Sequence, residues 1–164
     1  MSRYHLAQIN VARLKAPIDS PQLKDFVDNL DRINELAENS DGFVWRLKGD
    51  GNDATALRPF GDDVIVNMTV WRDADSLRNY VYKSPHTAIM KRRREWFARM
   101  AEAYYCLWWV PAGHVPTVEE AAVRLELIRA KGPTTESFNF GEAFSAPDSA
   151  AGGEPFSFKD TCPA

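Results

Sequence analysis

The sequence is poor in cysteine and has no long apolar run. Its two cysteines, Cys106 and Cys162, form no CxxC or Cys/His spacing, which argues against a disulfide framework and a zinc site. No apolar stretch reaches the roughly 18 residues that a membrane span needs. The N-terminus alternates like a strand and lacks the apolar segment of a signal peptide. We therefore expect a cytoplasmic protein that contacts no membrane and holds no metal.

Motifs of the common enzyme classes are missing too. The sequence has no P-loop, no GxGxxG and no nucleophile elbow, so kinase, dehydrogenase and hydrolase functions have no local support. A net charge of −3 gives no overall attraction to nucleic acid. The basic run from Lys91 to Arg94 is a local exception, and we interpret it as a solvated helix face. No nucleic-acid partner is expected.

The length and composition of the chain are those of one globular domain. The 164 residues are 45% hydrophobic and 12% aromatic, and five of them are tryptophan, a residue that commonly fills cores and small-molecule pockets. From Ser145 onward Ser, Pro, Gly and Ala dominate. We predict a domain over residues 1–144 and a disordered tail over 145–164.

Hydrophobic periodicity predicts alternating strands and helices. Strands are expected over 4–14, 43–49, 64–71 and 104–110, and helices over 20–39, 74–83, 84–104 and 117–131. A polar loop over 49–62 and a weakly alternating segment over 137–144, either an edge strand or a cover over the body, complete the chain. The order β-α-β-β-α-β predicts an α+β fold: a ferredoxin-like split βαβ with an antiparallel four-stranded sheet and an extra C-terminal helix.

Both faces of the predicted sheet carry apolar residues. Ala7, Ile9 and Val11 alternate with polar positions on the first strand, and Val66, Met68 and Val70 do so on the third. A ferredoxin-like fold places its helices on one face and leaves the other bare. A bare apolar face predicts a homodimer that closes sheet on sheet.

Several polar and aromatic residues are candidates for a site between sheet and helices. Asn67 and Trp71 share a face of the third strand, and an inward amide costs about 1–3 kcal/mol unless it is bonded. Trp71 fits a core indole as well as a pocket wall. Ser84 and Pro85 start a helix, which places His86 in its first turn, where it either moves a proton or satisfies the local backbone.

These residues resemble those of a known superfamily. The strand ending Asn67-x-x-x-Trp71, the following Arg-Asp-Ala-Asp-Ser-Leu and the first-strand Asn10 resemble the dimeric α+β barrel proteins, which include the antibiotic-biosynthesis monooxygenases and haem-degrading relatives. Within that superfamily, residues 1–144 are most similar to an uncharacterised bacterial domain family. The similarity rests on Ser84-Pro85-His86, on Arg94-Glu95-Trp96-Phe97 and on Trp108-Trp109-Val110-Pro111-x-Gly113-x-x-Pro116-Thr117.

The resemblance implies a function and a set of site residues. In the cofactor-free monooxygenases a first-strand Asn and an Asn/Trp pair line the substrate cavity, matching Asn10, Asn67 and Trp71. We expect an enzyme without metal or flavin, a cofactor-independent monooxygenase or an isomerase or cyclase, acting on an aromatic or polyketide-like molecule. The predicted catalytic residues are His86, Asn67 and Trp71, and the predicted substrate-binding residues are Gln8, Asn10, Trp45, Tyr82 and Trp108.

The alternative is a non-catalytic homodimer that binds a small hydrophobic ligand or haem. The haem-degrading relatives use a helix histidine as axial ligand. Here Met90 and Lys91 stand near that place and His86 comes earlier. A closed pocket of a few hundred Å³ with convergent polar groups distinguishes the enzyme from a solidly packed structural protein.

Overall fold

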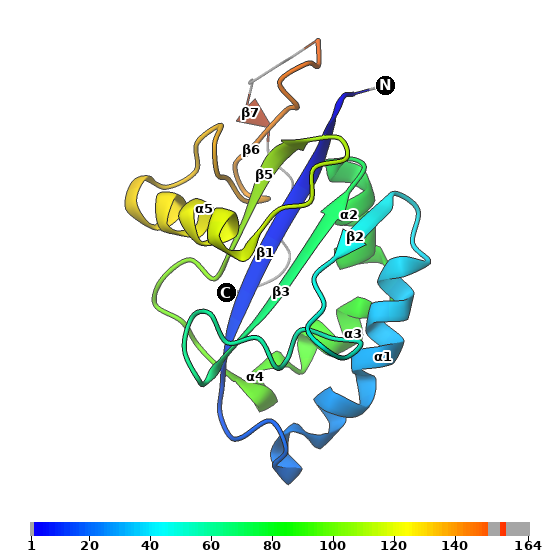
Figure 1. The fold of residues 1–164 in the computed structure, drawn as a ribbon, viewed down its shortest axis with the longest axis vertical. Helices are drawn as coiled ribbons and strands as arrows, with labels where there is room; N and C mark the ends of the chain where they lie inside the picture. Colours follow the sequence, from blue (N-terminus) through cyan, green and yellow to red (C-terminus); the bar gives the residue numbers. More distant parts are fainter. Residues whose placement is uncertain (1, 151–154, 157–164) are drawn as a thin grey trace.

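The computed structural model describes residues 2–150, 155 and 156. Its main sheet is antiparallel and has the spatial order β2-β3-β1-β5, with the two-residue β4 also pairing with β1 (Figure 1). The strands are β1 (Tyr4–Leu14), β2 (Phe43–Arg46), β3 (Val64–Trp71), β4 (Phe97–Ala98) and β5 (Tyr105–Pro111). The predicted ferredoxin-like α+β topology is confirmed.

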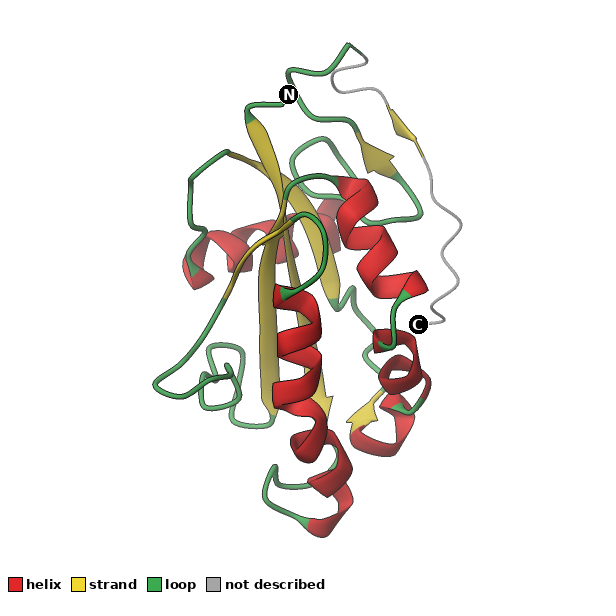
Figure 2. Ribbon diagram, turned by 90° about the vertical axis from the view of Figure 1, so that its right-hand side faces the viewer, coloured by secondary structure: helices red, strands yellow, loops and turns green. Residues whose placement is uncertain are grey.

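Four of the helices lie on one side of this sheet (Figures 1 and 2). They are α1 (Lys24–Glu38), which follows a 3-10 turn at Pro21–Leu23, then α2 (Ala74–Lys83), α3 (His86–Lys91) and α4 (Arg93–Trp96). The prediction of one helix over 84–104 is wrong. The helix breaks at Arg92 and ends at Trp96, because Trp96 is buried against β1 and the next two residues pair with Arg13 and Leu14.

Side-chain hydrogen bonds satisfy backbone N–H groups at the start of three helices. Asp73 Oδ1 accepts from the Ser76 N–H at 2.8 Å, and Thr117 Oγ1 accepts from the Glu120 N–H at 3.1 Å. Ser84 Oγ accepts from the His86 N–H at 3.1 Å, which fixes the entry into α3. Each bond satisfies a backbone donor that has no partner inside its helix.

The register between β1 and β3 decides which residues face the helices. Gln8 pairs with Thr69 and Asn10 pairs with Asn67, so these four polar side chains share the helix-facing side of the sheet. The intervening pair, Ile9 and Met68, faces the opposite side. Periodicity defined the two sets of residues, and the structure shows which set meets the helices.

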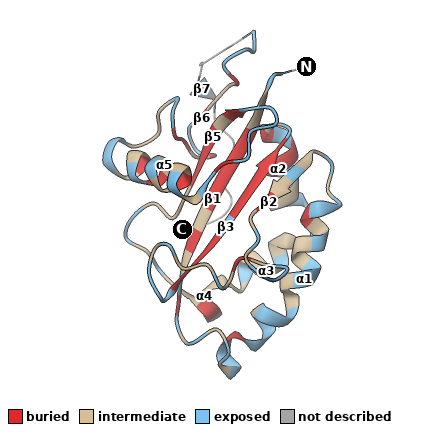
Figure 3. Ribbon diagram, viewed as in Figure 1, coloured by how far each residue is buried: buried red, intermediate tan, exposed pale blue. Residues whose placement is uncertain are grey.

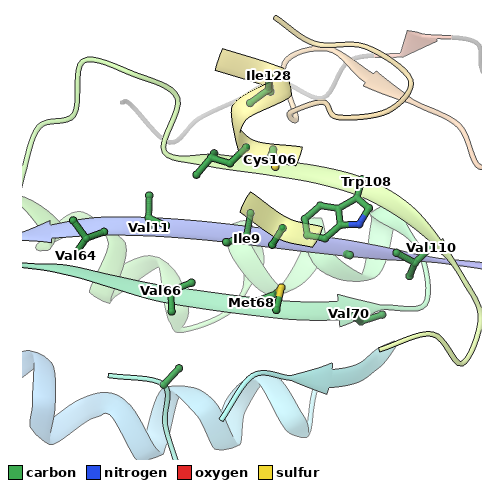
Figure 4. Packing of buried hydrophobic residues seen from close by; sticks show 14 residues of the cluster. Ile9, Val11, Val64, Val66, Met68, Val70, Cys106, Trp108, Val110 and Ile128 are labelled. Carbon is green, nitrogen blue, oxygen red and sulfur yellow. The ribbon is translucent and has the colours of Figure 1, made fainter. Parts of the chain in front are cut away.

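The opposite face of the sheet is covered by the chain itself, so the prediction of a bare apolar face is wrong. Helix α5 (Val118–Lys131) packs Ala121, Leu125 and Ile128 onto it, and residues from the 47–60 segment pack beside them. Figure 4 shows Cys106, Trp108 and Ile128 grouped above the apolar side chains of β1 and β3. A homodimer that closes sheet on sheet was predicted from a bare apolar face, and this face is covered by the chain itself. A homodimer therefore stays an untested prediction, without that argument for it.

The burial pattern agrees with this covering (Figure 3). Ala7 and Ile9 have no exposed surface, and Met68 and Val70 are 1% exposed. Cys106 is also fully buried, and its burial raises the pKa of the thiol to about 11. A sheet covered on both faces explains why both faces of its strands carry apolar residues.

The segment after α5 returns to the sheet edge. Phe138 pairs with Leu107 through two backbone hydrogen bonds of 2.7 and 2.9 Å, and β6 (Ala143–Phe144) pairs with β7 (Pro155–Phe156). Asp148 accepts from the Ser2 hydroxyl and the Arg3 N–H. Most of the predicted tail, with Cys162, lies outside the described residues. None of the helices in the described part of the chain is long and apolar enough to cross a membrane.

Replacing Leu125 with alanine tests the packing of α5 on the sheet. Leu125 has no exposed surface, so L125A leaves a cavity and lowers the free energy of unfolding by about 2–5 kcal/mol in urea denaturation. Val123, on the same helix, is 65% exposed, and V123A changes stability by less than about 0.5 kcal/mol. Equal effects of the two substitutions would show that α5 does not pack as described.

Candidate active site

A cavity of about 240 Å³ lies between the helix-facing side of the sheet and helices α1, α2 and α3. Its walls are rich in aromatic rings from five different parts of the chain: Phe26, Tyr80, Tyr82, Phe97, Tyr105 and Phe140. Apolar walls with a few placed polar groups are typical of small-molecule sites. The cavity therefore has the composition expected of a site for a flat, largely apolar ligand.

The floor of the cavity is a hydrogen-bonded cluster of amides on β1 and β3. Asn67 Oδ1 accepts from Gln8 Nε2 at 2.8 Å and from Asn10 Nδ2 at 3.2 Å. Gln8 Nε2 also donates to Thr69 Oγ1 at 2.8 Å, and Gln8 Oε1 accepts from Asn10 Nδ2 at 3.1 Å. The two neighbours hold the Asn67 carboxamide in one orientation.

This orientation leaves the Asn67 amide nitrogen available to a ligand. Both bonds to its neighbours use Oδ1, and no bond from Nδ2 to another described residue is present. Asn67 is also exposed, although it belongs to a strand with neighbours on both sides. Two N–H donors on a fixed amide in an apolar cavity are suited to an oxygen atom that carries negative charge.

Trp71 lies behind the cavity wall and does not line it. Its indole has no exposed surface and donates to Thr69 Oγ1 at 2.8 Å. It stacks on Tyr80 with 5.1 Å between ring centroids, and Tyr80 in turn lies 4.8 Å from the His86 ring. Trp71 therefore supports two residues of the cavity, Thr69 and Tyr80, from the core side.

His86 lines the cavity as an uncharged imidazole. Burial lowers the pKa of His86 from 6.5 to about 4, and a hydrogen bond to the Val81 backbone acts in the opposite direction. Its Nδ1 is buried and has no hydrogen-bond partner among the described residues. The ring is thus neutral near pH 7, and its Nδ1 is shielded from solvent.

The remaining predicted residues divide between the two faces of the sheet. Tyr82 lines the cavity and meets Phe140 edge-on at 5.7 Å. Trp108 packs into the opposite face of the sheet with Ile9 and Met68 (Figure 4), and Trp45 packs against the same cluster. The structure therefore brings together Gln8, Asn10, Asn67, Tyr82 and His86 but places Trp45 and Trp108 away from them.

The cavity residues that the sequence analysis did not predict include Arg46, Arg93, Tyr105 and Phe140. Tyr105 could have been found, because it pairs with Asn10 and so shares its face. Arg46 is 5% exposed and closes the β2 end of the cavity by bonding to Glu38 at 2.6 Å and to Asn52 Oδ1 at 2.9 Å. Phe140 lies in the segment after α5, and no local sequence pattern predicts that it lines the cavity.

The described residues contain no group of three or more His, Cys, Asp or Glu side chains that could hold a metal ion. Haem ligation would depend on His86. Since Nδ1 is buried, an iron could approach only Nε2, and the ring is packed against Tyr80 with 4.8 Å between the ring centroids. The placed ring therefore does not present a ready axial ligand.

The fold and cavity together define the class of protein: a ferredoxin-like α+β domain with an amide-floored pocket between sheet and helices. Residues 5–153 match the family model described as "Domain of unknown function (DUF3291)", and the chain belongs to this family. This confirms the resemblance to an uncharacterised domain family. No curated protein matches the chain.

Several solved structures are similar in fold. A protein of unknown function, NE2512 from Nitrosomonas europaea, is 16% identical over 70% of this chain and 97% of its own, with a TM-score of 0.44. SnoaB, a cofactor-independent oxygenase from Streptomyces nogalater, is 15% identical over 68% and 95%, with a TM-score of 0.43. A dabb family protein with a ferredoxin-like fold from Mesorhizobium loti is 15% identical over 69% and 98%, with a TM-score of 0.40. At these scores the likenesses carry no argument about activity.

The pH dependence of stability tests the state of His86. The unfolded chain takes up a proton on this histidine below about pH 6.5, whereas the folded chain does so only near pH 4, so acidification favours unfolding in between. From pH 7 to pH 5 the native protein should lose about 2 kcal/mol that H86Q does not lose. Urea denaturation at both pH values measures the difference, and identical losses in the two proteins would contradict a buried neutral imidazole.

Proposed function

We propose that this protein is a cofactor-independent monooxygenase that oxidises a small phenolic or enolic aromatic molecule in the cavity. The observation that supports the proposal is the fixed Asn67 carboxamide, whose two N–H donors project from the floor of an aromatic-walled pocket. An oxygen-bearing aromatic ring fits both parts of that site. Its ring packs between the aromatic walls, and its oxygen accepts from Asn67 Nδ2.

The chemistry follows from the charge that the amide stabilises. Loss of the phenolic proton gives an anion whose charge spreads onto ring carbons, and donors placed at the oxygen lower the cost of forming it in an apolar cavity. A ring carbon of the anion can then react with O₂. One oxygen atom stays on the ring as a quinone carbonyl and the other leaves as water, so the substrate itself supplies the electrons.

Each residue has a distinct part in this scheme. Asn67 binds the oxyanion, and Gln8 and Asn10 fix its orientation from β1. His86 lines the cavity and is the proposed proton acceptor, and because its Nδ1 is shielded it would act through Nε2 or turn its ring. Trp71 acts at a distance, by holding Thr69 and Tyr80.

Turnover of 1-naphthol tests the role of Asn67. The expected reaction consumes one O₂ for each 1,4-naphthoquinone formed, followed with an oxygen electrode and by absorbance. Because loss of one oxyanion donor costs about 10²–10³ in rate, N67A should lower kcat/KM about a hundredfold. Asn79 is exposed on α2 and lies outside the cavity, so N79A should retain the native rate.

If every accepted phenol were turned over as fast by N67A as by the native protein, the catalytic assignment would be wrong. Binding of naphthol without oxygen uptake would instead identify a non-catalytic ligand-binding protein. The same donors would stabilise the enolate of an isomerase or cyclase, and product formation without oxygen uptake would identify that reaction.

His86 is tested separately by its effect on the rate. A positioned proton acceptor contributes about 10²–10⁴ in rate, so H86Q should lower kcat by at least about a hundredfold while leaving naphthol affinity nearly unchanged. The measurement is kcat and KM at pH 7 and at pH 8.5, where more of the phenol is ionised. A substrate that arrives ionised needs no base, so the defect of H86Q should shrink at the higher pH. A defect of the same size at both pH values would exclude the proton-transfer role.

A further inference from the structure

Thr69 is a polar residue of the cavity to which the scheme above gives no contact with the ligand. It lies on β3, two residues after Asn67 and on the same face, and it lines the cavity although only 5% of its surface is exposed. Its hydroxyl oxygen accepts from Gln8 Nε2 at 2.8 Å and from the indole Nε1 of Trp71 at 2.8 Å. Both neighbours therefore act as donors to Thr69.

These two bonds leave the Thr69 hydroxyl with its hydrogen alone. A threonine hydroxyl has two acceptor lone pairs and one hydrogen, so a hydroxyl that already accepts twice can make a further bond only as a donor. Among the described residues, none accepts a hydrogen bond from Thr69 Oγ1. Thr55, which also lines the cavity, differs because its hydroxyl already donates to Asp53 Oδ1 at 2.6 Å. A buried O–H without an acceptor is unfavourable, so Thr69 requires an acceptor inside the cavity.

The chemistry of the two donors fixes the direction of both bonds. An indole nitrogen can only donate, so the bond between Trp71 and Thr69 has one possible direction. The Gln8 carboxamide uses its oxygen to accept from Asn10 Nδ2 at 3.1 Å, and its nitrogen faces Thr69. Thr69 is thus held as an acceptor toward the protein, which leaves the role of donor for the ligand.

The Thr69 hydroxyl is also next to the amide floor. Gln8 Nε2 lies 2.8 Å from both Thr69 Oγ1 and Asn67 Oδ1, so one nitrogen holds the two groups beside each other. A hydroxyl that accepts hydrogen bonds is polarised by them, which strengthens the bond that it donates in turn. The floor of the cavity therefore offers a hydroxyl hydrogen in addition to the N–H groups of Asn67.

We propose that the Thr69 hydroxyl donates a hydrogen bond to an oxygen atom of the bound ligand and, together with Asn67, stabilises the negative charge of the ligand. This assignment rests on the proposed function and adds a catalytic residue to it. Gln8 and Trp71 are positioning residues, because they occupy the lone pairs of Thr69 and leave only its hydrogen for the ligand. Trp71 thereby influences the reaction without touching the ligand.

Ionisation of bound 4-nitrophenol measures this donation without turnover. The probe absorbs visible light strongly only as its anion, so a pH titration of the probe bound to the full-length protein under nitrogen gives its acid dissociation constant. A donor that bonds to the anion favours ionisation. Because one hydrogen bond to a charged oxygen is worth at least about tenfold, T69V should lower the dissociation constant of the bound probe about tenfold. T69S keeps the hydroxyl and should match the native protein.

Thr135 provides a matched control. It is exposed and does not line the cavity, so T135V makes the same chemical change away from the probe and should leave its ionisation unchanged. Equal effects of T69V and T135V would overturn the assignment. T69V also removes the acceptor of the Trp71 indole, so circular dichroism and thermal unfolding check that it folds. W71F, which keeps the hydroxyl but frees one of its lone pairs, should also lower the dissociation constant, and native ionisation in W71F would overturn the positioning role of the indole.

The outcomes separate this assignment from the proposed function. A lower dissociation constant in N67A but not in T69V would overturn the role of Thr69 and leave that of Asn67 intact. A lower constant in T69V but not in N67A would support donation by Thr69 and contradict the role of Asn67. If the native protein bound the neutral probe more tightly than its anion, the floor would present acceptors instead of donors, and both assignments would be overturned. Absence of binding would overturn both as well.

Discussion

The antiparallel pairing of β1 with β3 is the constraint on which the site depends. Asn10 lies opposite Asn67 and Gln8 lies opposite Thr69, so one register brings four polar side chains together in the middle of the sheet. Because side chains alternate along a strand, a slip of one residue would turn this cluster to the other face and bring Ile9 and Met68 toward the helices. The apolar face, packed under α5, opposes such a slip, and core packing thereby holds the polar floor in place.

The two faces of the sheet differ in packing: one is densely covered and the other borders the cavity. On one face α5 and the 47–60 segment pack densely around Trp108, and the residues of β1 and β3 there have almost no exposed surface. On the other face the helices leave a cavity of about 240 Å³ above Asn67. A dense layer on one side gives the sheet the rigidity that a preorganised donor requires on the other, since a donor that moved with its ligand would stabilise a developing charge less well.

Sequence patterns predicted those features that depend only on residues close together in the chain. The bounds of β1 and the assignment of Asn67 and Trp71 to one face of β3 follow from alternation along the strand, and both are confirmed. Asp73 and Thr117 likewise begin their helices through local bonds to backbone N–H groups three residues later. The helix predicted over 84–104 failed because the burial of Trp96 and the pairing of Phe97 with Leu14 stop it, and both are contacts with distant parts of the chain. Among the predicted site residues, Trp45 and Trp108 lie on the face opposite the cavity. They were assigned to the site because alternation along a strand does not show which of its two faces meets the helices.

The sequence by itself determined the order of strands and helices and the division of strand residues into two faces. Periodicity also placed Gln8 and Asn10 on one face of their strand and Asn67 on one face of its own, and the β1–β3 register decided that these two faces coincide. Tertiary structure decided that α5 covers the apolar face and that Phe140 and Arg93 reach the cavity. It also decided that burial keeps His86 uncharged. These features depend on which remote segments meet and on how much water they exclude, and no short stretch of sequence carries that information.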